Sequence, residues 1–408
     1  MGLNLPKGWM QPMESAAREP GKDPEINRTE KFLERYMDYI FIAAVLILAV
    51  AVRLMVFDFR THDYETFLAK WMETLREHGF SSFKEGFSDY TPPYLYVLWL
   101  LSPLPLDKLY AVKLGSVLFD FLLAFYAMKI AGLSHPRRAY RYAAFAAALF
   151  LPTAILNGAV WGQCDVIFTA FLAGCIYYQM KEKPALSMLF FALAFSFKLQ
   201  AVFLAPFLVF MLIKSRYRLK DFLLIPGVYL GLSIPVLLAG RPLGEVLTIY
   251  FSQYNSYSSL TLSCPNFYHW IYPADDYTFS IAGMLLTMAV LAFLAYAGWH
   301  LTRGRSIPGN EAVIQIALIS VLVMPYFLPR MHERYFFPAD AIALIWALYN
   351  PRRAVFAVAV SLISVFSCTV YLFGVEPIEM GKMAILMLGV ILLVIRETYK
   401  ALSQNRCL

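Results

Sequence analysis

The sequence predicts an all-α polytopic membrane protein, and three observations lead to this fold class. Of the 408 residues, 60% are hydrophobic and only 15% are charged, whereas soluble domains carry about 25% charged residues. Apolar runs of about 20 residues, long enough to cross a bilayer as a helix, recur along the whole chain. Lysine and arginine gather in alternate loops between these runs. No soluble domain is apparent.

About twelve membrane-spanning helices are predicted, each from one apolar run. They are expected near residues 38–57, 109–131, 141–157, 164–180, 184–198, 199–213, 222–240, 279–301, 311–328, 337–350, 354–374 and 380–397. The short runs 184–198 and 199–213 are compatible with one broken or re-entrant helix. Residues 1–36 form a polar tail, and residues 37–408 are expected to form a single transmembrane domain.

The basic residues predict the orientation of this domain. A cytoplasmic N-terminus places six basic groups in cytoplasmic loops or the C-terminal tail. These groups are Arg137/Arg138/Arg141, Lys181/Lys183, Lys214/Arg216/Arg218/Lys220, Arg303/Arg305, Arg352/Arg353 and Arg396/Lys400/Arg406. Both termini are then cytoplasmic, and much of the net charge of +7 is explained by topology and not by nucleic-acid binding.

The opposite face of the membrane receives the remaining polar segments. They are the first outer loop at 58–108, the segment 157–165, Lys198, the outer loop at 241–278, and residues 330–340. Because the positive-inside rule does not explain these charges, we expect the segments to build one extracytoplasmic site.

Asp63 begins the most informative part of the first outer loop. Phe67, Leu68, Trp71, Met72 and Leu75 recur at helical spacing after it, which predicts an amphipathic interfacial helix over 65–77. Trp71 suits an interface anchor. Asp63 would lie beside an apolar layer, which favours a role as a general base. It could equally cap the following helix, with Glu65 adding favourable charge at the helix N-terminus.

A second group of polar residues follows at Asp89 and Tyr90. The double proline at 92–93 predicts an extended entry into a short re-entrant or interfacial helix that ends near Leu104. Asp89 could bind a sugar hydroxyl or cap this helix.

Three further outer segments contain candidate substrate-binding residues. Trp161, Gln163 and Asp165 lie in a polar junction, where Trp161 and Gln163 suit a sugar ring and its hydroxyls, or where the segment is simply a turn with an interfacial tryptophan. Lys198 lies between two apolar runs, where a lysine is costly unless it snorkels or binds an anion such as phosphate.

His332, Glu333 and Arg334 are consecutive and lie between two predicted spans. His332 and Arg334 can donate to a phosphate while Glu333 orients one of them, although a purely structural ion pair is the alternative. Arg330 could add to the same positive field. The tyrosines and tryptophan of 250–276 could line a sugar or acceptor cleft or form an interfacial belt. Cys164 and Cys264 both fall in outer segments, so a disulfide between them is possible.

Taken in order, these segments resemble a known family. Asp63-Tyr64-Glu65 with Trp71-Met72-Glu73, Asp89-Tyr90-Thr91-Pro92-Pro93-Tyr94, Trp161-Gly162-Gln163 and His332-Glu333-Arg334-Tyr335 resemble motifs of GT-C glycosyltransferases. The nearest resemblance is to the glucosyltransferases that extend lipid-linked oligosaccharides, and to the second mannosyltransferase of GPI-anchor synthesis with its bacterial relatives. Those glucosyltransferases carry Lys-Ser after His-Glu, so the sugar and the acceptor stay open.

The resemblance implies a GT-C-like fold and an inverting transfer of a hexose, mannose or glucose, from a polyprenyl-phosphate donor. The acceptor would be a glycan, a lipid or a polymer. By position, Asp63 would be the base, Asp89 would help to place a sugar, and Lys198, His332 and Arg334 would receive the lipid phosphate. No cofactor or metal is required, although Asp63, Asp89 and Asp165 could bind one if they converge.

Two other classes of protein are compatible with the same sequence. A secondary transporter or a lipid or glycolipid flippase with about twelve spans would place ionisable residues near the middle of the bilayer and interrupt helices in matching halves. Here the ionisable residues cluster toward one face, which favours an enzyme. A non-catalytic subunit on the same scaffold is the third possibility, and the presence of both Asp63 and Asp89 argues against it.

Overall fold

The structure is a computed structural model that describes residues 24–254, 259–271, 276–307 and 309–403. Its contacts divide the chain into two units, Met1–Ile47 and Leu48–Leu408. The described part of the first unit is helix α1, which starts at Pro24 and runs to Leu54 in the second. All contacts and cavities described below lie within the second unit.

Each of the twelve predicted spans coincides with a helix or with consecutive helical segments. After α1 these are α4 (Lys108–Ser134), α5 (Arg138–Leu149) with α6 (Pro152–Ala154) and η3 (Ile155–Trp161), α7 (Asp165–Met180), α8 (Pro184–Phe197), η4 (Leu199–Leu204) with α9 (Ala205–Ile213), η5 (Leu219–Leu223) with α10 (Leu224–Leu238), α12 (Asp276–Leu301), α13 (Gly309–Phe327), α14 (Phe337–Tyr349), η7 (Pro351–Arg353) with α15 (Ala354–Phe373), and α16 (Met380–Ser403). The all-α polytopic membrane fold is therefore confirmed.

The number of helices that could cross a membrane is smaller than the estimate of about twelve. By length and composition, six helices in the described part of the chain qualify, or up to seven if the pair Arg138–Leu149 and Pro152–Trp161, bent by 43°, counts as one span. The predicted spans at α7, α8, α9 and α14 are shorter apolar helices. An apolar run alone does not distinguish a full span from a shorter buried helix.

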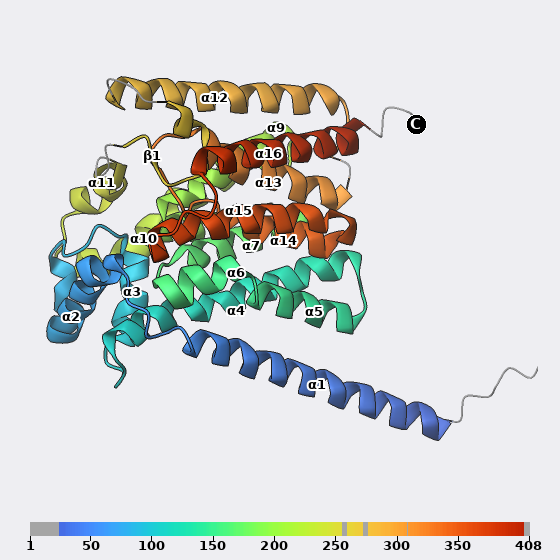
Figure 1. Ribbon diagram of the computed structural model, residues 1–408, viewed down its shortest axis with the longest axis horizontal. Helices are drawn as coiled ribbons and strands as arrows, with labels where there is room; N and C mark the ends of the chain where they lie inside the picture. The colour runs from blue at the N-terminus through green and yellow to red at the C-terminus, as the bar shows by residue number, and fades with distance from the viewer. Residues whose placement is uncertain (1–23, 255–258, 272–275, 308, 404–408) are drawn as a thin grey trace, which may run out of the picture. The chain divides into compact units, whose positions relative to one another are not determined.

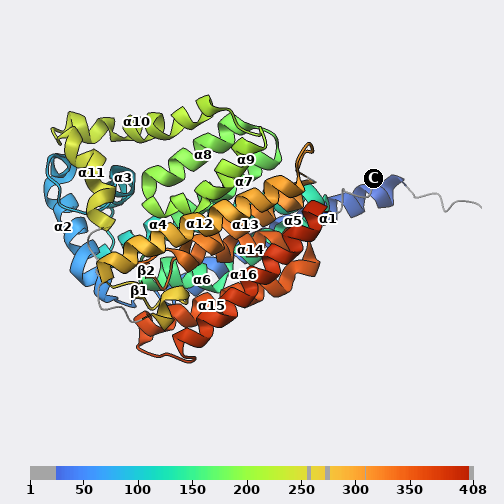
Figure 2. The same cartoon turned by 90° about the horizontal axis from the view of Figure 1, so that it is seen from above.

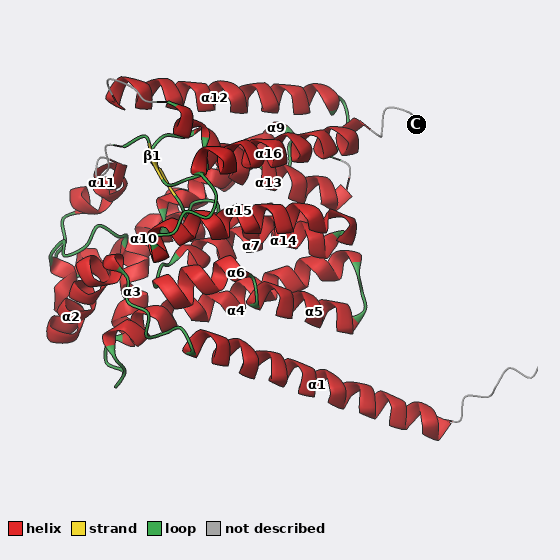
Figure 3. Cartoon of the chain, viewed as in Figure 1, coloured by secondary structure: helices red, strands yellow, loops and turns green. Residues whose placement is uncertain are grey.

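The short elements gather at one end of the helix bundle. They are η1 (Tyr64–Leu68), α2 (Ala69–His78), η2 (Gly79–Lys84), α3 (Pro92–Leu101), α11 (Leu243–Tyr254), η6 (Phe267–Trp270), and the strands β1 (Thr261–Leu262) and β2 (Met331–His332). Figure 1 shows α2, α3, α11 and β1 together beside the ends of α4 and α15. Figure 3 shows how little strand the fold contains. Strands β1 and β2 pair in parallel and join the 241–278 segment to the segment after α13.

The basic loops meet one another at the other ends of their helices. Ser134, after α4, donates to the carbonyl of Tyr349 at the end of α14 over 2.8 Å, and Tyr140 donates to that of Leu348 over 2.7 Å. Lys214, after α9, donates to the carbonyls of Thr302 and Arg305, each over 2.7 Å. The fold thus separates the basic loops from the short elements, as the alternation of charge predicts.

The packing of the bundle places α7 in a central position. It packs against α4 and α8, while α14 packs against α13 and α15. Figure 2 shows α10 on one flank of this arrangement and α15 with α16 on the other. A buried ion pair ties the last turn of α1 to α4, because Arg53 Nε lies 2.8 Å from Asp120 Oδ2 and both side chains are 1% exposed.

Candidate functional site

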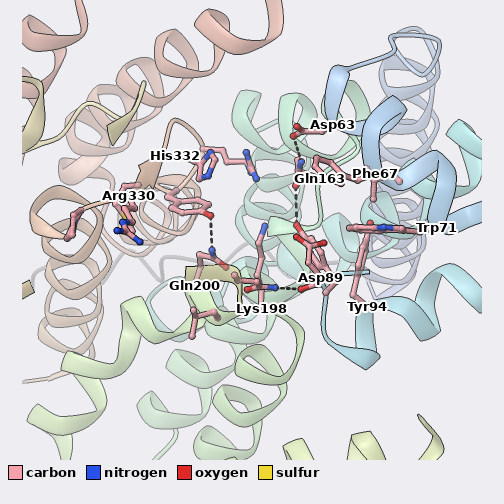
Figure 4. Close-up of a pocket in the computed structure, with 18 residues that line it drawn as sticks. Asp63, Phe67, Trp71, Asp89, Tyr94, Gln163, Lys198, Gln200, Arg330 and His332 are labelled. Carbon is pink, nitrogen blue, oxygen red and sulfur yellow. Dashed lines mark hydrogen bonds between the residues drawn. The ribbon is translucent and has the colours of Figure 1, made fainter. Parts of the chain in front are cut away.

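A cavity of about 150 Å³ opens at the end of the bundle that carries the short elements. Its walls come from η1, α2, the 89–94 segment, the break after α8, and the segment after α13. The lining residues are Asp63, Phe67, Leu68, Trp71, Asp89, Tyr90, Tyr94, Gln163, Lys198, Leu199, Gln200, Gln253, Pro329, Arg330, Met331, His332, Arg334 and Tyr335. Figure 4 shows Arg330 and His332 on one side and Asp63, Phe67 and Trp71 on the other.

Asp63 is held by three side-chain donors. Trp161 Nε1 and Gln163 Nε2 donate to Oδ2 over 2.9 and 2.7 Å, and the hydroxyl of Tyr371 donates to Oδ1 over 2.7 Å. The side chain of Asp63 makes no capping hydrogen bond to η1, although the residue occupies the N-cap position. The alternative that Asp63 serves as a helix cap is therefore wrong, because its carboxylate is engaged across the fold instead.

The donors of Asp63 come from the irregular junction between η3 and α7. The π-helical turn of η3 ends at Gly162, which has the left-handed backbone (φ 81°, ψ 19°) that glycine adopts without strain. Ser116 on α4 fixes the next residue by donating to the carbonyl of Gln163 over 2.6 Å. This turn allows Trp161 and Gln163, on either side of the glycine, to reach the same carboxylate oxygen.

Lys198 lies in the break between α8 and η4, where the backbone is extended (φ −155°, ψ 137°). Its Nζ lies 2.5 Å from Oδ1 of Asp165, and the Nε of Arg334 lies 3.4 Å from Oδ2. Asn157 also donates to that second oxygen over 2.8 Å. Asp165 does not line the cavity, whereas Lys198 and Arg334 do. The buried carboxylate of Asp165 therefore lies behind the cavity wall and holds the side chains of Lys198 and Arg334, which face the cavity.

His332 and Glu333 adjoin this ion-pair network. Burial, together with the positive charges of Arg334 and Lys198, lowers the pKa of His332, so its imidazole is neutral at pH 7. Glu333 lies 3.2 Å from Arg334, and burial raises the pKa of its carboxyl while that cation opposes the rise. Arg330 lines the cavity with a positive φ of 63°, which is a strained conformation for a residue other than glycine.

The 89–94 segment forms a further part of the cavity wall. Asp89 lies at the rim, where partial desolvation raises the pKa of its carboxyl and Lys198 opposes the rise. Gln253 holds the segment by donating to the Asp89 carbonyl over 2.5 Å. The ring of Tyr90 lies 5.3 Å from that of Trp71 and 5.5 Å from Lys198 Nζ. Trp71 is only 6% exposed and lines the cavity, so it does not act as an interface anchor.

Most of the residues expected at the site do converge. Eight of the predicted residues line the cavity: Asp63, Asp89, Tyr90, Gln163, Lys198, Arg330, His332 and Arg334. Trp161, Asp165 and Glu333 are buried behind its wall, where they contact the lining residues and not the cavity itself. Glu65 is exposed outside the cavity.

The aromatic segment 250–276 contributes less to the cavity than its composition suggests. Tyr250 and Tyr268 donate to the carbonyls of Phe195 and Phe327, and neither lines the cavity. Tyr257 and Tyr272 lie outside the described residues. Cys164 and Cys264 are both free thiols, so the possible disulfide between them is absent. Within the described ranges, no group of three histidine, cysteine or acidic residues could hold a metal ion.

The sequence pattern gave no role to three polar residues at the site. Tyr371 lies at the end of an apolar run and contacts Asp63, while Gln200 and Tyr335 line the cavity and share a 2.8 Å hydrogen bond. Polar or aromatic residues at the ends of the predicted spans were the signal by which they could have been found.

Comparison with known proteins gives a partial answer about the family. Residues 68–239 match the family model described as GPI transamidase subunit PIG-U. Over this stretch the chain is similar to a multi-pass membrane family of the GPI pathway.

The PIG-U match covers less than half of the chain. It includes Asp89, Asp165 and Lys198 but neither Asp63 nor the segment that carries His332 and Arg334. No curated protein matches the chain. The similarity therefore supports a multi-pass membrane protein and leaves its chemistry to be inferred from the site.

Proposed function

We propose that the chain is a GT-C-type glycosyltransferase that moves a hexose from a polyprenyl-phosphate donor to an acceptor hydroxyl. The observation that carries this proposal is one small cavity that is lined both by three cationic side chains, Lys198, Arg330 and Arg334, and by the carboxylate of Asp63. The site lies on the extracytoplasmic face in this proposal, because the basic loops gather at the other ends of the helices. The acceptor is a glycan, a lipid or a polymer at that face.

The donor phosphate would bind the cationic side chains of the cavity, which are Lys198, Arg330 and Arg334. The neutral imidazole of His332 supplies a further polar contact. Charge-assisted hydrogen bonds to phosphate are about twice as strong as neutral ones. Because Asp165 holds Lys198 and Arg334 in place before any ligand binds, little reorganisation is needed as charge develops on the leaving phosphate.

The acceptor would bind beside Asp63. Its hydroxyl oxygen attacks the anomeric carbon, the bond between that carbon and the phosphate oxygen breaks, and the phosphate leaves with the bonding electrons. Asp63 receives the hydroxyl proton. Three donors hold the Asp63 carboxylate in place. It accepts the proton as the attacking oxygen acquires positive charge.

The direct test uses the purified chain in lipid nanodiscs with a panel of polyprenyl-phosphate hexoses and candidate acceptors. We expect a product with inverted anomeric configuration, and its loss in Asp63→Asn. Lys198→Ala should weaken donor binding. Glu77→Gln, an exposed change on α2, is the control and should retain activity. Undiminished transfer by Asp63→Asn would remove Asp63 as the base.

The PIG-U match favours a second candidate function, namely a non-catalytic subunit that binds a lipid-linked glycan. The same cavity would then bind the phosphate and the sugar without turnover. This candidate predicts that the wild-type chain and Asp63→Asn bind polyprenyl-phosphate hexose equally and that neither forms a product. Transport of the lipid across proteoliposomes without transfer would instead indicate a flippase.

A further inference from the structure

A further cavity, of about 780 Å³, lies between α9, α12, α13 and α16. It shares no lining residue with the cavity that carries Asp63. Figure 1 shows α12 at the top of the bundle, above α9, α13 and α16. Ala292, Ala295 and Gly298 line the space from α12, and their small size keeps the helices from filling it. These four helices therefore enclose a groove, called here the α12 groove.

The walls of the α12 groove present hydrocarbon. Thr287, Ser320 and Thr398 line it, but each of their hydroxyls donates to a backbone carbonyl over 2.8 Å. Hydroxyls that are satisfied within the protein require no polar ligand. Apart from these three residues and Tyr399, the lining residues are aliphatic, methionine, phenylalanine, proline or glycine. A ligand of this groove must therefore be apolar along its length.

The groove reaches the end of the bundle that carries the basic loops. Its lining includes Ile213 and Leu301, which are the last residues of α9 and α12. Helix α16 lines it only in its final turns, from Ile395 to Leu402. The most closely lined stretch of α12, Leu291–Leu301, spans about 15 Å. One leaflet of a bilayer core is about 15 Å thick, so the groove fits a chain that enters from this end.

Positive charges surround this end of the groove. Arg303 follows two residues after Leu301, and Arg396 follows Ile395 directly. Both are exposed, and neither forms an ion pair with any residue that the structure describes. The nearby carboxylate of Glu397 is already paired with Arg353 and Lys400. The mouth of an apolar groove is thus positively charged, a combination that suits an anionic amphiphile.

We propose that the α12 groove binds one anionic phospholipid of the surrounding bilayer. Its acyl chains lie between α12 and the other three helices, and its phosphate meets Arg303 and Arg396. Basic pockets between membrane helices bind anionic headgroups in this way. A neutral lipid would match the walls of the groove but not the charge at its mouth.

This lipid is distinct from the donor of the proposed reaction. The donor phosphate would bind Lys198 and Arg334, at the end of the bundle that carries the short elements. The phospholipid headgroup would lie at the opposite end, beside the basic loops. The inference therefore concerns a bilayer lipid alone and does not depend on the proposed glycosyl transfer.

The test is the thermal unfolding of the purified full chain in detergent, followed by tryptophan fluorescence, with added phosphatidylglycerol or phosphatidylcholine of the same acyl chains. A ligand that binds only the folded state raises the midpoint with its concentration. We expect this rise with phosphatidylglycerol in the wild type and its loss in Ala295→Phe, whose ring occupies the groove. Ala289→Phe makes the same change at an exposed position of α12 outside the groove, and it should keep the response.

A second variant keeps the proposal testable if Ala295→Phe does not fold. Arg303→Gln with Arg396→Gln should raise the phosphatidylglycerol concentration for half-maximal stabilisation by about fivefold for each charge removed. Lys181→Gln with Lys183→Gln removes two charges from another basic loop and is the control. Equal stabilisation by the two lipids would overturn the proposal. So would a response that survives in Ala295→Phe, or displacement of phosphatidylglycerol by polyprenyl phosphate, which would assign the groove to the donor chain.

Discussion

Tyr371 donates a hydrogen bond of 2.7 Å to Oδ1 of Asp63, although 308 residues separate the two in the sequence. The backbone N–H of Asp63 donates in return to the Tyr371 hydroxyl over 3.1 Å. The tyrosine ring also stacks on Trp161, with centroids 4.6 Å apart and planes 11° apart. Helix α15 thus fixes the direction in which the carboxylate of Asp63 points.

Tyr371→Phe should slow transfer without weakening donor binding. The variant keeps the stack on Trp161 and loses only the hydroxyl, so Asp63 is less well oriented. Small misplacements of a reacting group cost up to about 100-fold in rate. We expect kcat to fall at least about tenfold while the donor KM stays unchanged. Tyr296→Phe, on an exposed face of α12, is the control, and a parallel rise of KM would argue for a general structural role.

Gly162→Ala should destabilise the protein because Gly162 has a φ of 81°. The new methyl group meets its nearest neighbours at 3.6 Å, which is ordinary contact, so the cost is conformational. A left-handed alanine costs about 1–2 kcal/mol. Gly231→Ala, in the interior of α10 with open space around it, is the control and should be neutral or stabilising. Equal effects of the two changes in denaturant titrations would contradict this reasoning.

Acid should destabilise the wild type more than His332→Gln. Burial and the charges of Arg334 and Lys198 lower the pKa of His332 below its ordinary value of 6.5, so the unfolded chain binds a proton that the folded protein does not. The contribution is complete above pH 6.5 and is lost as pH falls below that value.

The measurement for this prediction is the difference between the unfolding midpoints of the two proteins. We expect it to change in favour of the variant between about pH 7.5 and pH 5. The raised pKa values of Asp89 and Glu333 act in the opposite direction, but both groups are present in both proteins and largely cancel in the difference. A difference that does not change with pH would show that His332 does not control this window.

Asp120→Ala should be strongly destabilising because it leaves Arg53 buried without its counter-ion. Removing one member of a buried ion pair costs about 3–5 kcal/mol. The double change Arg53→Met with Asp120→Leu should recover most of that loss, since apolar residues of similar volume often replace a buried pair without penalty. Additive losses in the double variant would show that the two residues do not act as a pair.

The sequence predicted the polar residues at the site better than their roles. Asp63, Lys198 and Arg334 are charged residues that break an apolar pattern, and such residues are conspicuous because burying charge is costly. The alternation of basic loops along the chain predicted that these residues lie at the same end of the bundle. Trp161 was expected to contact a sugar, but its buried ring supports Asp63 and lies 5.1 Å from the Arg334 guanidinium carbon.

The contribution of α15 could not be predicted in this way. Tyr371 is an ordinary residue within an apolar run, and only the packing of α15 against α14 and η3 brings it to Asp63. Fewer helices in the described part of the chain are long and apolar enough to cross a membrane than the sequence predicted, and the shorter helices α7 and α14 are mostly buried in protein. Burial in protein and burial in lipid select the same residue types, and the sequence does not distinguish them.

The placement of Asp165 behind Lys198 and Arg334 has a consequence for the response to salt. Dissolved ions screen exposed charges over about 8 Å at physiological ionic strength, but they reach buried pairs poorly. The side chains of Lys198 and Asp165 are only 5% and 2% exposed. The cations of the cavity therefore keep their positions and their field over a wide range of ionic strength, so that an anionic headgroup meets the same electrostatic surface in dilute and in saline surroundings.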